Sequence, residues 1–160
     1  MLYRQLLGAD FDKLPRALRE FHSKPGGGRA VGTVAVRHTN RLLAWLAGLP
    51  AAGDNVPIRL EVVADDNQEV WTRRFGNQVR RSVQWRNAGL LVEAAGPVRV
   101  SFRIQVEDGV MRFESQRARL WMIPLPLRVS AIARGNESSW EAEVNIAHLG
   151  WYRAAMVPTP

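Results

Sequence analysis

Apolar and polar residues alternate with a period of two along most of the chain after Val56. The clearest run is PVRVSFRIQVE, in which valines, Phe102 and Ile104 alternate with arginine, serine and glutamine. Successive side chains of a β-strand point to opposite faces of the sheet, so this pattern predicts strands with one buried face. No helical pattern separates these strands, and this excludes a doubly wound parallel sheet.

Short turns join the predicted strands. Turns of about two to five residues, such as the one at Asp108-Gly109, leave no room for crossovers and favour hairpins between sequence neighbours. We count about nine strands, including AVGTVAVRH before Val56. An open sheet of this size curls or closes on itself. The predicted fold class is therefore mainly β (α+β): a strongly curved antiparallel meander or up-and-down β-barrel-like sheet with two N-terminal helices.

Two segments before the sheet have helical spacing. Segment 8–23 has Asp10 or Asp12 as a candidate N-cap, Pro15 near its first turn, and apolar residues three to four positions apart. Segment 41–49, RLLAWLAGL, is apolar on nearly every side. It is predicted to be a buried helix at the mouth of the barrel.

The length of 160 residues fits one domain, and we expect residues 1–160 to form it. Its predicted parts are a helical N-terminal part with one short strand over 1–50, the antiparallel sheet over 56–148, and a C-terminal tail over 149–160.

The stretch RLWMIPLPLRV interrupts the alternation with Pro124 and Pro126. Proline donates no hydrogen bond to a sheet, so this stretch is predicted to be an edge or crossing segment and not a central strand. Its apolar residues are expected to cover the protein's own core, or else a partner. They are Trp121, Met122, Ile123, Leu125 and Leu127.

The composition excludes several classes of protein. The chain has no cysteine, which rules out disulfides and thiolate chemistry and fits a reducing cytoplasm. The N-terminus has no signal-peptide pattern, and the longest apolar run is too short to span a bilayer. We therefore expect a cytoplasmic protein without a membrane span.

The formal net charge of +7 comes largely from arginine, since only Lys13 and Lys24 are lysines. A nucleic-acid-binding protein concentrates such charge on one element. Here the arginines are scattered along the chain, often between apolar residues of the predicted strands. We do not expect a nucleic-acid partner, and a solvated outer face of the sheet explains the charge.

Familiar catalytic patterns are missing. The three histidines His22, His38 and His148 lack the spacing of a zinc site, and there is no nucleophile elbow for a serine hydrolase. The acidic run 65–69 lacks the length and glycine of a calcium loop and fits a hairpin turn. No catalytic residue, cofactor site or metal site is predicted.

Several polar side chains fall on faces that are otherwise apolar. Arg73 lies between Trp71 and Phe75, and an unpaired buried guanidinium costs several kcal/mol, so it needs an acceptor. The same reasoning, applied to the other strands, predicts a ligand site with apolar walls and an arginine-lined end for an acidic group. Its predicted residues are Arg73, Arg81, Arg117, Trp85 and His148. The competing interpretation places these residues at a wet rim or pairs them with inward glutamates, because strand faces predicted from sequence shift at every β-bulge.

Six segments occur in an order that resembles a known family. They are LLGADFDKLPRALREFH, LAWLAGLPAAGDNVPIRLEV, EVWTRRFG, GLLVEAAGPVRVSFRIQVEDG, WMIPLP and GWYRAA. The order resembles the bacterial domain of unknown function 4166 family. Members occur alone or fused behind a dehydrogenase-like domain that binds a nicotinamide dinucleotide. The resemblance implies no activity, and PGGGRA lacks the glycine spacing of a dinucleotide-binding loop.

The leading hypothesis is a non-enzymatic ligand-binding or accessory domain that holds an amphipathic, acidic small molecule in a β-barrel-like cavity. The first alternative is an interaction module that docks on a dehydrogenase-like partner. The second is a cofactor-independent isomerase or cyclase in which a buried arginine or histidine works with a carboxylate such as Glu114.

Overall fold

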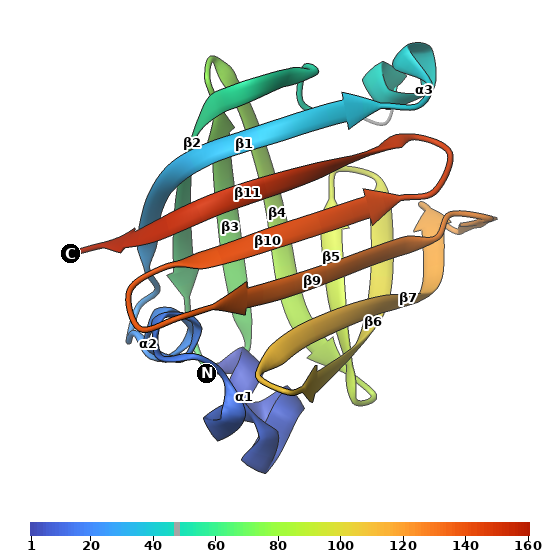
Figure 1. Cartoon of the computed structure of the whole chain (residues 1–160). Coiled ribbons are helices and arrows are strands. Elements are labelled where there is room, and N and C mark those ends of the chain that lie inside the picture. Colours follow the sequence, from blue (N-terminus) through green and yellow to red (C-terminus); the bar gives the residue numbers. More distant parts are fainter. Residues whose placement is uncertain (47–48) are drawn as a thin grey trace.

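The computed structural model describes residues 1–46 and 49–160 and forms an antiparallel barrel with helical segments at its ends (Figure 1). The N-terminal segments are α1 (Leu2–Leu7), the 3-10 helix η1 (Gly8–Lys13) and α2 (Arg16–Ser23). The strands are β1 (Arg29–His38), β2 (Gly53–Ala64), β3 (Gln68–Phe75), β4 (Gln78–Asn87), β5 (Leu90–Ala95), β6 (Val98–Glu107), β7 (Val110–Leu120), β8 (Ile123–Leu125), β9 (Val129–Gly135), β10 (Trp140–Ile146) and β11 (Gly150–Thr159). Helix α3 (Arg41–Leu46) follows β1.

The barrel is closed. Its strands follow the order β6-β5-β4-β3-β2-β1-β11-β10-β9-β7, and β6 pairs with β7 to complete the ring. Every pair is antiparallel, and sequence neighbours pair as the short turns require. This confirms the predicted mainly β class and the up-and-down barrel. The predicted number of strands was too low because β8 and β11 were missed.

The segment expected to be a C-terminal tail, 149–160, contains strand β11 instead. It pairs with β1 along its length, from His38 opposite Gly150 to Arg29 opposite Thr159. Gly32 lies at a close approach of this seam, since a Cβ there would overlap the backbone oxygen of Ala155. Strand β11 also forms a hairpin with its sequence neighbour β10, from Ile146 opposite Gly150 to Trp140 opposite Met156. The prediction failed because the buried face of β11 carries the small residues Gly150 and Ala154, which give no strong apolar alternation.

The N-terminal helical segments close one end of the barrel. Figure 1 shows them below the strands, and α1 contacts β4 and β6 while α2 contacts β9. Leu14, Leu18 and Phe21 are buried, and the ring of Phe21 lies 4.7 Å from that of Trp140. The predicted helix over 8–23 is split because Pro15 is the N-cap of α2.

The predicted N-caps were wrong, and the end of the predicted helix 41–49 lies partly outside the described residues. Asp10 and Asp12 lie within η1, and no side chain caps η1 or α2. Helix α3 leaves the end of β1 that lies away from α1 and α2 (Figure 1). Ala47 and Gly48, where the predicted helix 41–49 was to end, lie outside the described residues. No helix in the described part of the chain has the length and apolar character needed to cross a bilayer.

The proline stretch forms an edge, as predicted. Strand β8 pairs with β7 alone, with Pro124 opposite Arg119. Leu125 and Leu127 pack against the core, whereas Trp121, Met122 and Ile123 are exposed. The segment therefore covers the protein's own core with only part of its apolar surface.

The alternation on β6 assigns Phe102 to the core and Arg103 to the outer face, and two substitutions test this assignment. Phe102 is 7% exposed and belongs to the core, whereas Arg103 is exposed on the outer face opposite Glu114. Phe102→Asp should destabilise the fold by more than about 3 kcal/mol, because it buries an unpaired charge. Arg103→Asp should cost less than about 1 kcal/mol despite facing a glutamate. Urea denaturation followed by circular dichroism measures both, and equal losses would show that both faces of β6 are covered.

Candidate functional site in the barrel interior

Of the five predicted site residues, only Arg73 lies inside the barrel. Arg81 and Arg117 are exposed on the outer face, and His148 is exposed in the turn between β10 and β11. Trp85 is half-buried on the outer face, where the guanidinium carbon of Arg99 lies 5.4 Å from its ring centre. The predicted convergence of three arginines at one end of the barrel is therefore wrong.

Two local features explain the error. On β4 the inward residues are the polar ones: Ser82 and Gln84 are 2% and 3% exposed, which turns Arg81 and Trp85 outward. On β7 the pairing shifts by one residue, because Phe102 faces Ser115 while Ser101 faces Arg117. This β-bulge reverses the face of every β7 residue after it.

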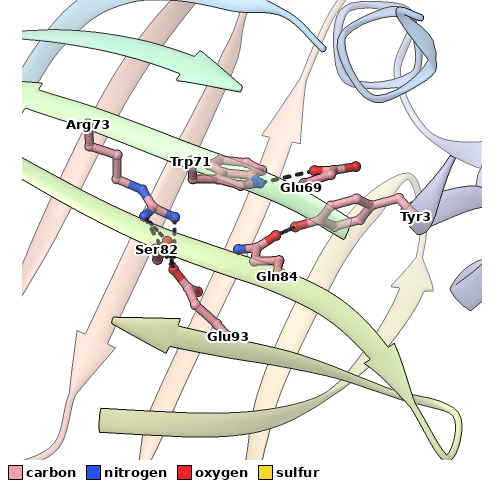
Figure 2. Close-up of polar contacts among 7 residues, drawn as sticks. All are labelled: Tyr3, Glu69, Trp71, Arg73, Ser82, Gln84 and Glu93. Carbon is pink, nitrogen blue, oxygen red and sulfur yellow. Dashed lines mark hydrogen bonds and ion pairs between the residues drawn. The ribbon is translucent and has the colours of Figure 1, made fainter. Parts of the chain in front are cut away.

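Arg73 is the centre of a polar cluster that joins three neighbouring strands (Figure 2). Its Nη1 donates to Ser82 Oγ at 2.8 Å, and both Nη atoms donate to Glu93 Oε1 at 3.2 Å. Ser82 Oγ also donates to Glu93 Oε1 at 2.6 Å. Burial is the largest single influence on the pKa of Arg73 and lowers it, but the attraction and hydrogen bond of Glu93, together with Tyr152 and Tyr3, raise this pKa above its usual value. The guanidinium is thus charged, and the carboxylate of Glu93 balances that charge.

A second polar group lies nearer the helical end of the same strands (Figure 2). The Tyr3 hydroxyl of α1 donates to Gln84 Oε1 at 2.9 Å, which ties α1 to β4. Trp71 Nε1 donates to Glu69 Oε2 at 3.0 Å. Burial raises the pKa of Glu69 to about 7, and the hydrogen bond from Trp71 opposes this rise. Glu69 therefore changes its charge near neutral pH.

His22 is buried against this group and is uncharged at neutral pH. Its ring centre lies 3.9 Å from that of Tyr3 and 5.9 Å from that of Trp71. Burial lowers its pKa to about 3. A neutral ring packed between aromatic side chains is structural, and His22 closes the helical end of the barrel.

Space accessible to solvent borders the Arg73 cluster. The Arg73 and Glu93 side chains point inward from β3 and β5, yet they keep 19% and 23% of their surface accessible. Among the described residues, Glu93 Oε2 receives no hydrogen bond, and Oε1 takes all three. Inward apolar residues of other strands are also only partly buried. They include Val56, Val98, Ile104, Phe113, Val129 and Tyr152.

The polar and apolar parts of the interior lie on opposite walls. In the ring of ten strands, β3, β4 and β5 stand across from β9, β10 and β11, and Figure 1 shows these two groups behind and in front of the interior. Val129, Val144 and Tyr152 face inward from the second group. The two walls approach each other at Tyr152, whose ring on β11 lies 6.2 Å from that of Phe75 on β3.

The two remaining candidates for chemistry are the carboxylate of Glu114 and a metal-binding cluster. Glu114, the carboxylate proposed for an enzymatic role, is exposed on the outer face of β7. Within residues 1–46 and 49–160, no three His, Asp or Glu side chains are grouped so that they could hold a metal ion.

The sequence reasoning missed Glu69, Ser82 and Glu93. Glu69 could have been found, because it continues the inner face of β3 that Trp71 and Arg73 define. Ser82 and Glu93 gave no such signal. They occupy inward positions on β4 and β5 where the local pattern favours the neighbouring apolar residues.

Comparison with known proteins identifies the family. A family model described as "Domain of unknown function (DUF4166)" matches residues 14–151, which confirms the resemblance seen in the ordered segments. Searches of curated proteins and of solved structures returned no match.

The raised pKa of Glu69 predicts a pH-dependent effect on stability. In the unfolded chain this carboxyl loses its proton near its ordinary pKa of 4.5, whereas the folded protein keeps the proton until about pH 7. The unfolded state binds fewer protons in this window, so Glu69 lowers the free energy of unfolding as the pH rises through it. Glu69→Gln imitates the protonated carboxyl and can still accept from Trp71.

The Gln variant should therefore gain roughly 2 to 3 kcal/mol relative to wild type between about pH 5 and about pH 8. Urea denaturation at several pH values measures this difference. Other groups, including His22, titrate in both proteins and cancel. A difference that stays constant with pH would show that Glu69 is already ionised in the fold at pH 5.

Proposed function

The chain belongs to the DUF4166 family, and we propose that it is a non-enzymatic binding domain that holds an amphipathic small molecule inside the barrel. The observation that carries this proposal is the accessible Arg73–Glu93 pair in the interior of a closed barrel. Side chains just fill an eight-stranded barrel or leave room for one small ligand, and ten strands enclose a wider interior.

The division of the interior into two walls supports an amphipathic ligand. Partly buried apolar side chains such as Val129 and Val144 gain by covering hydrocarbon, at about 25 cal/mol for each Å² removed from water. On the opposite wall, the polar groups of β3, β4 and β5 fix the orientation of a head group. A few polar groups in an otherwise apolar cavity are typical of small-molecule sites.

The hydrogen bonds of the cluster favour a head group that donates. An acidic ligand was expected because three arginines were predicted to line the site, but only Arg73 faces inward, and Glu93 balances its charge. A ligand carboxylate would have to displace Glu93. The free Oε2 atom of Glu93 instead accepts from a hydroxyl or amide of the ligand, and such a bond to a charged acceptor contributes about 1.5 to 3 kcal/mol.

The polar interior also favours binding over the proposed isomerase or cyclase. An acid–base pair needs two groups that exchange protons near the working pH. Arg73 stays protonated beside Glu93, and His22 is kept neutral by burial.

Dodecanol and dodecanoate test the proposal, because they share a chain and differ in the head group. Dodecanol should raise the melting temperature of the wild-type protein more than dodecanoate does. In Glu93→Gln the guanidinium of Arg73 loses its partner and becomes free for an anion, so the preference should reverse. Thermal unfolding with each compound, followed by circular dichroism, measures both effects.

Two further variants serve as a control on the outer face and as a replacement if Glu93→Gln does not fold. Glu143→Gln breaks an ion pair with Arg153 on the outer face and should leave the preference for dodecanol unchanged. If Glu93→Gln does not fold, the double variant Arg73→Met/Glu93→Gln removes both buried charges, which is often tolerated. It should bind both compounds equally. A wild-type protein that is stabilised by neither compound, or an unaltered preference in these interior variants, would contradict the proposed site.

A further inference from the structure

The tip of the β7–β8 hairpin exposes three consecutive apolar side chains. Trp121, Met122 and Ile123 are 69%, 81% and 61% exposed. We call these three residues the hairpin tip. Soluble proteins rarely leave large apolar side chains together in water, and such groups mark surfaces that contact something else.

The conformation of the hairpin tip is held in place. Trp121 has a positive φ of 51°, which is costly for an aromatic residue. Its backbone N–H donates to the oxygen of Pro97 in the β5–β6 turn at 2.9 Å. On either side of the tip, Leu120 pairs with Ile123, and Leu125 packs against the core. The fold thus holds a strained backbone conformation at Trp121, and in this conformation the three side chains face solvent.

Three arginines lie on the outer faces of β6 and β7, the strands that adjoin the tip. Arg99, Arg117 and Arg119 are exposed, and Arg99 lies directly opposite Arg119 across β6 and β7. None of the three forms an ion pair with any acidic residue of the described chain. Like charges directly opposite each other destabilise a sheet. The contact of Arg99 with the Trp85 ring leaves the like charges of Arg99 and Arg119 unneutralised, whereas an anionic surface would neutralise them.

A hollow separates the tip from the neighbouring turn. Its volume is about 390 Å³, and its lining includes Trp121 on one side, Gly96 and Pro97 on the other, and Arg99. The hollow offers an arginine beside apolar surface, a combination that suits a phosphate joined to hydrocarbon.

We propose that the hairpin tip, with Arg99, Arg117 and Arg119, docks the protein on the surface of an anionic lipid membrane. Met122 and Ile123 enter the outer hydrocarbon, Trp121 lies at the level of the head groups, and the arginines contact lipid phosphates. Each arginine near such a surface strengthens binding roughly five-fold. The docking surface is independent of the interior site, since none of its residues belongs to the Arg73 cluster.

A membrane fits this surface better than the other partners do. Nucleic acids stack their bases on aromatic rings, but two of the three tip residues, Met122 and Ile123, have no ring. A stable protein interface buries roughly 800 Å² on each partner, far more than a projecting three-residue tip supplies. A narrow apolar tip beside three exposed arginines matches an anionic bilayer, because the hydrocarbon admits the apolar side chains and the head groups attract the arginines.

Vesicle sedimentation tests the tip. Wild-type protein should sediment with vesicles of equimolar phosphatidylcholine and phosphatidylglycerol and bind much more weakly to phosphatidylcholine alone. Met122→Ser/Ile123→Ser should weaken binding to the anionic vesicles by at least about ten-fold, because it removes the inserted hydrocarbon. The matched control Val63→Ser/Val157→Ser also changes two exposed apolar residues, at 59% and 51%, and should bind like wild type.

A second pair of variants tests the arginines. Arg99→Gln/Arg119→Gln should weaken binding to the anionic vesicles by roughly twenty-fold. The barrel has a matched control, because Arg59 and Arg74 also face each other, across β2 and β3, and are exposed. Arg59→Gln/Arg74→Gln removes the same charge away from the tip and should weaken binding less than three-fold.

Three results would overturn the proposal. Equal losses in the two arginine variants would mean that the net charge of the protein attracts the vesicles without a docking surface. Wild-type binding by the tip variant would exclude insertion. A single-stranded oligonucleotide that binds wild type more tightly than the vesicles, and loses affinity in Arg99→Gln/Arg119→Gln, would assign the surface to nucleic acid. Thermal unfolding of each variant confirms that it is folded.

Discussion

The pairing of β1 with β11 is the constraint on which the rest of the structure depends. These strands lie near the two ends of the chain, and their ladder closes the sheet into a ring. Closure removes the free edges that an open sheet would expose and fixes the inner face of every strand. Gly32 allows the two backbones to approach at this seam. Because the ring is closed, a polar side chain on an inner face has to be paired inside or face enclosed water.

The interior meets this requirement by pairing or neutralising its titratable groups. Glu93 balances the charge of Arg73, and burial keeps His22 uncharged. Glu69 is the exception near neutral pH, because burial raises its pKa into that range. The same arrangement leaves one carboxylate oxygen of Glu93 free beside accessible space. In the proposed function, this oxygen accepts the hydrogen bond from the head group of the ligand.

Much of the barrel could be predicted from local sequence, and each wrong prediction has a physical cause. The strict alternation around Phe102 predicted the phase of β6, and Trp71 and Phe75 correctly placed Arg73 inside. Strand β4 was turned the wrong way because its apolar residues face outward, while Ser82 and Gln84 find partners on β5 and α1 that are distant in sequence.

Details of strand pairing and of the residues on buried faces explain the other errors. Arg117 follows a bulge that depends on the pairing of β7 with β6. Strand β11 was taken for a tail because Gly150 and Ala154 on its buried face weaken the alternation, although it pairs with its neighbour β10 as well as with the distant β1. A crystal structure of the protein with dodecanol would test the proposed interior site most directly. The alkyl chain should lie inside the barrel, with its hydroxyl within hydrogen-bond distance of Glu93 Oε2. An interior filled by side chains, or dodecanol bound only on the outer surface, would contradict it.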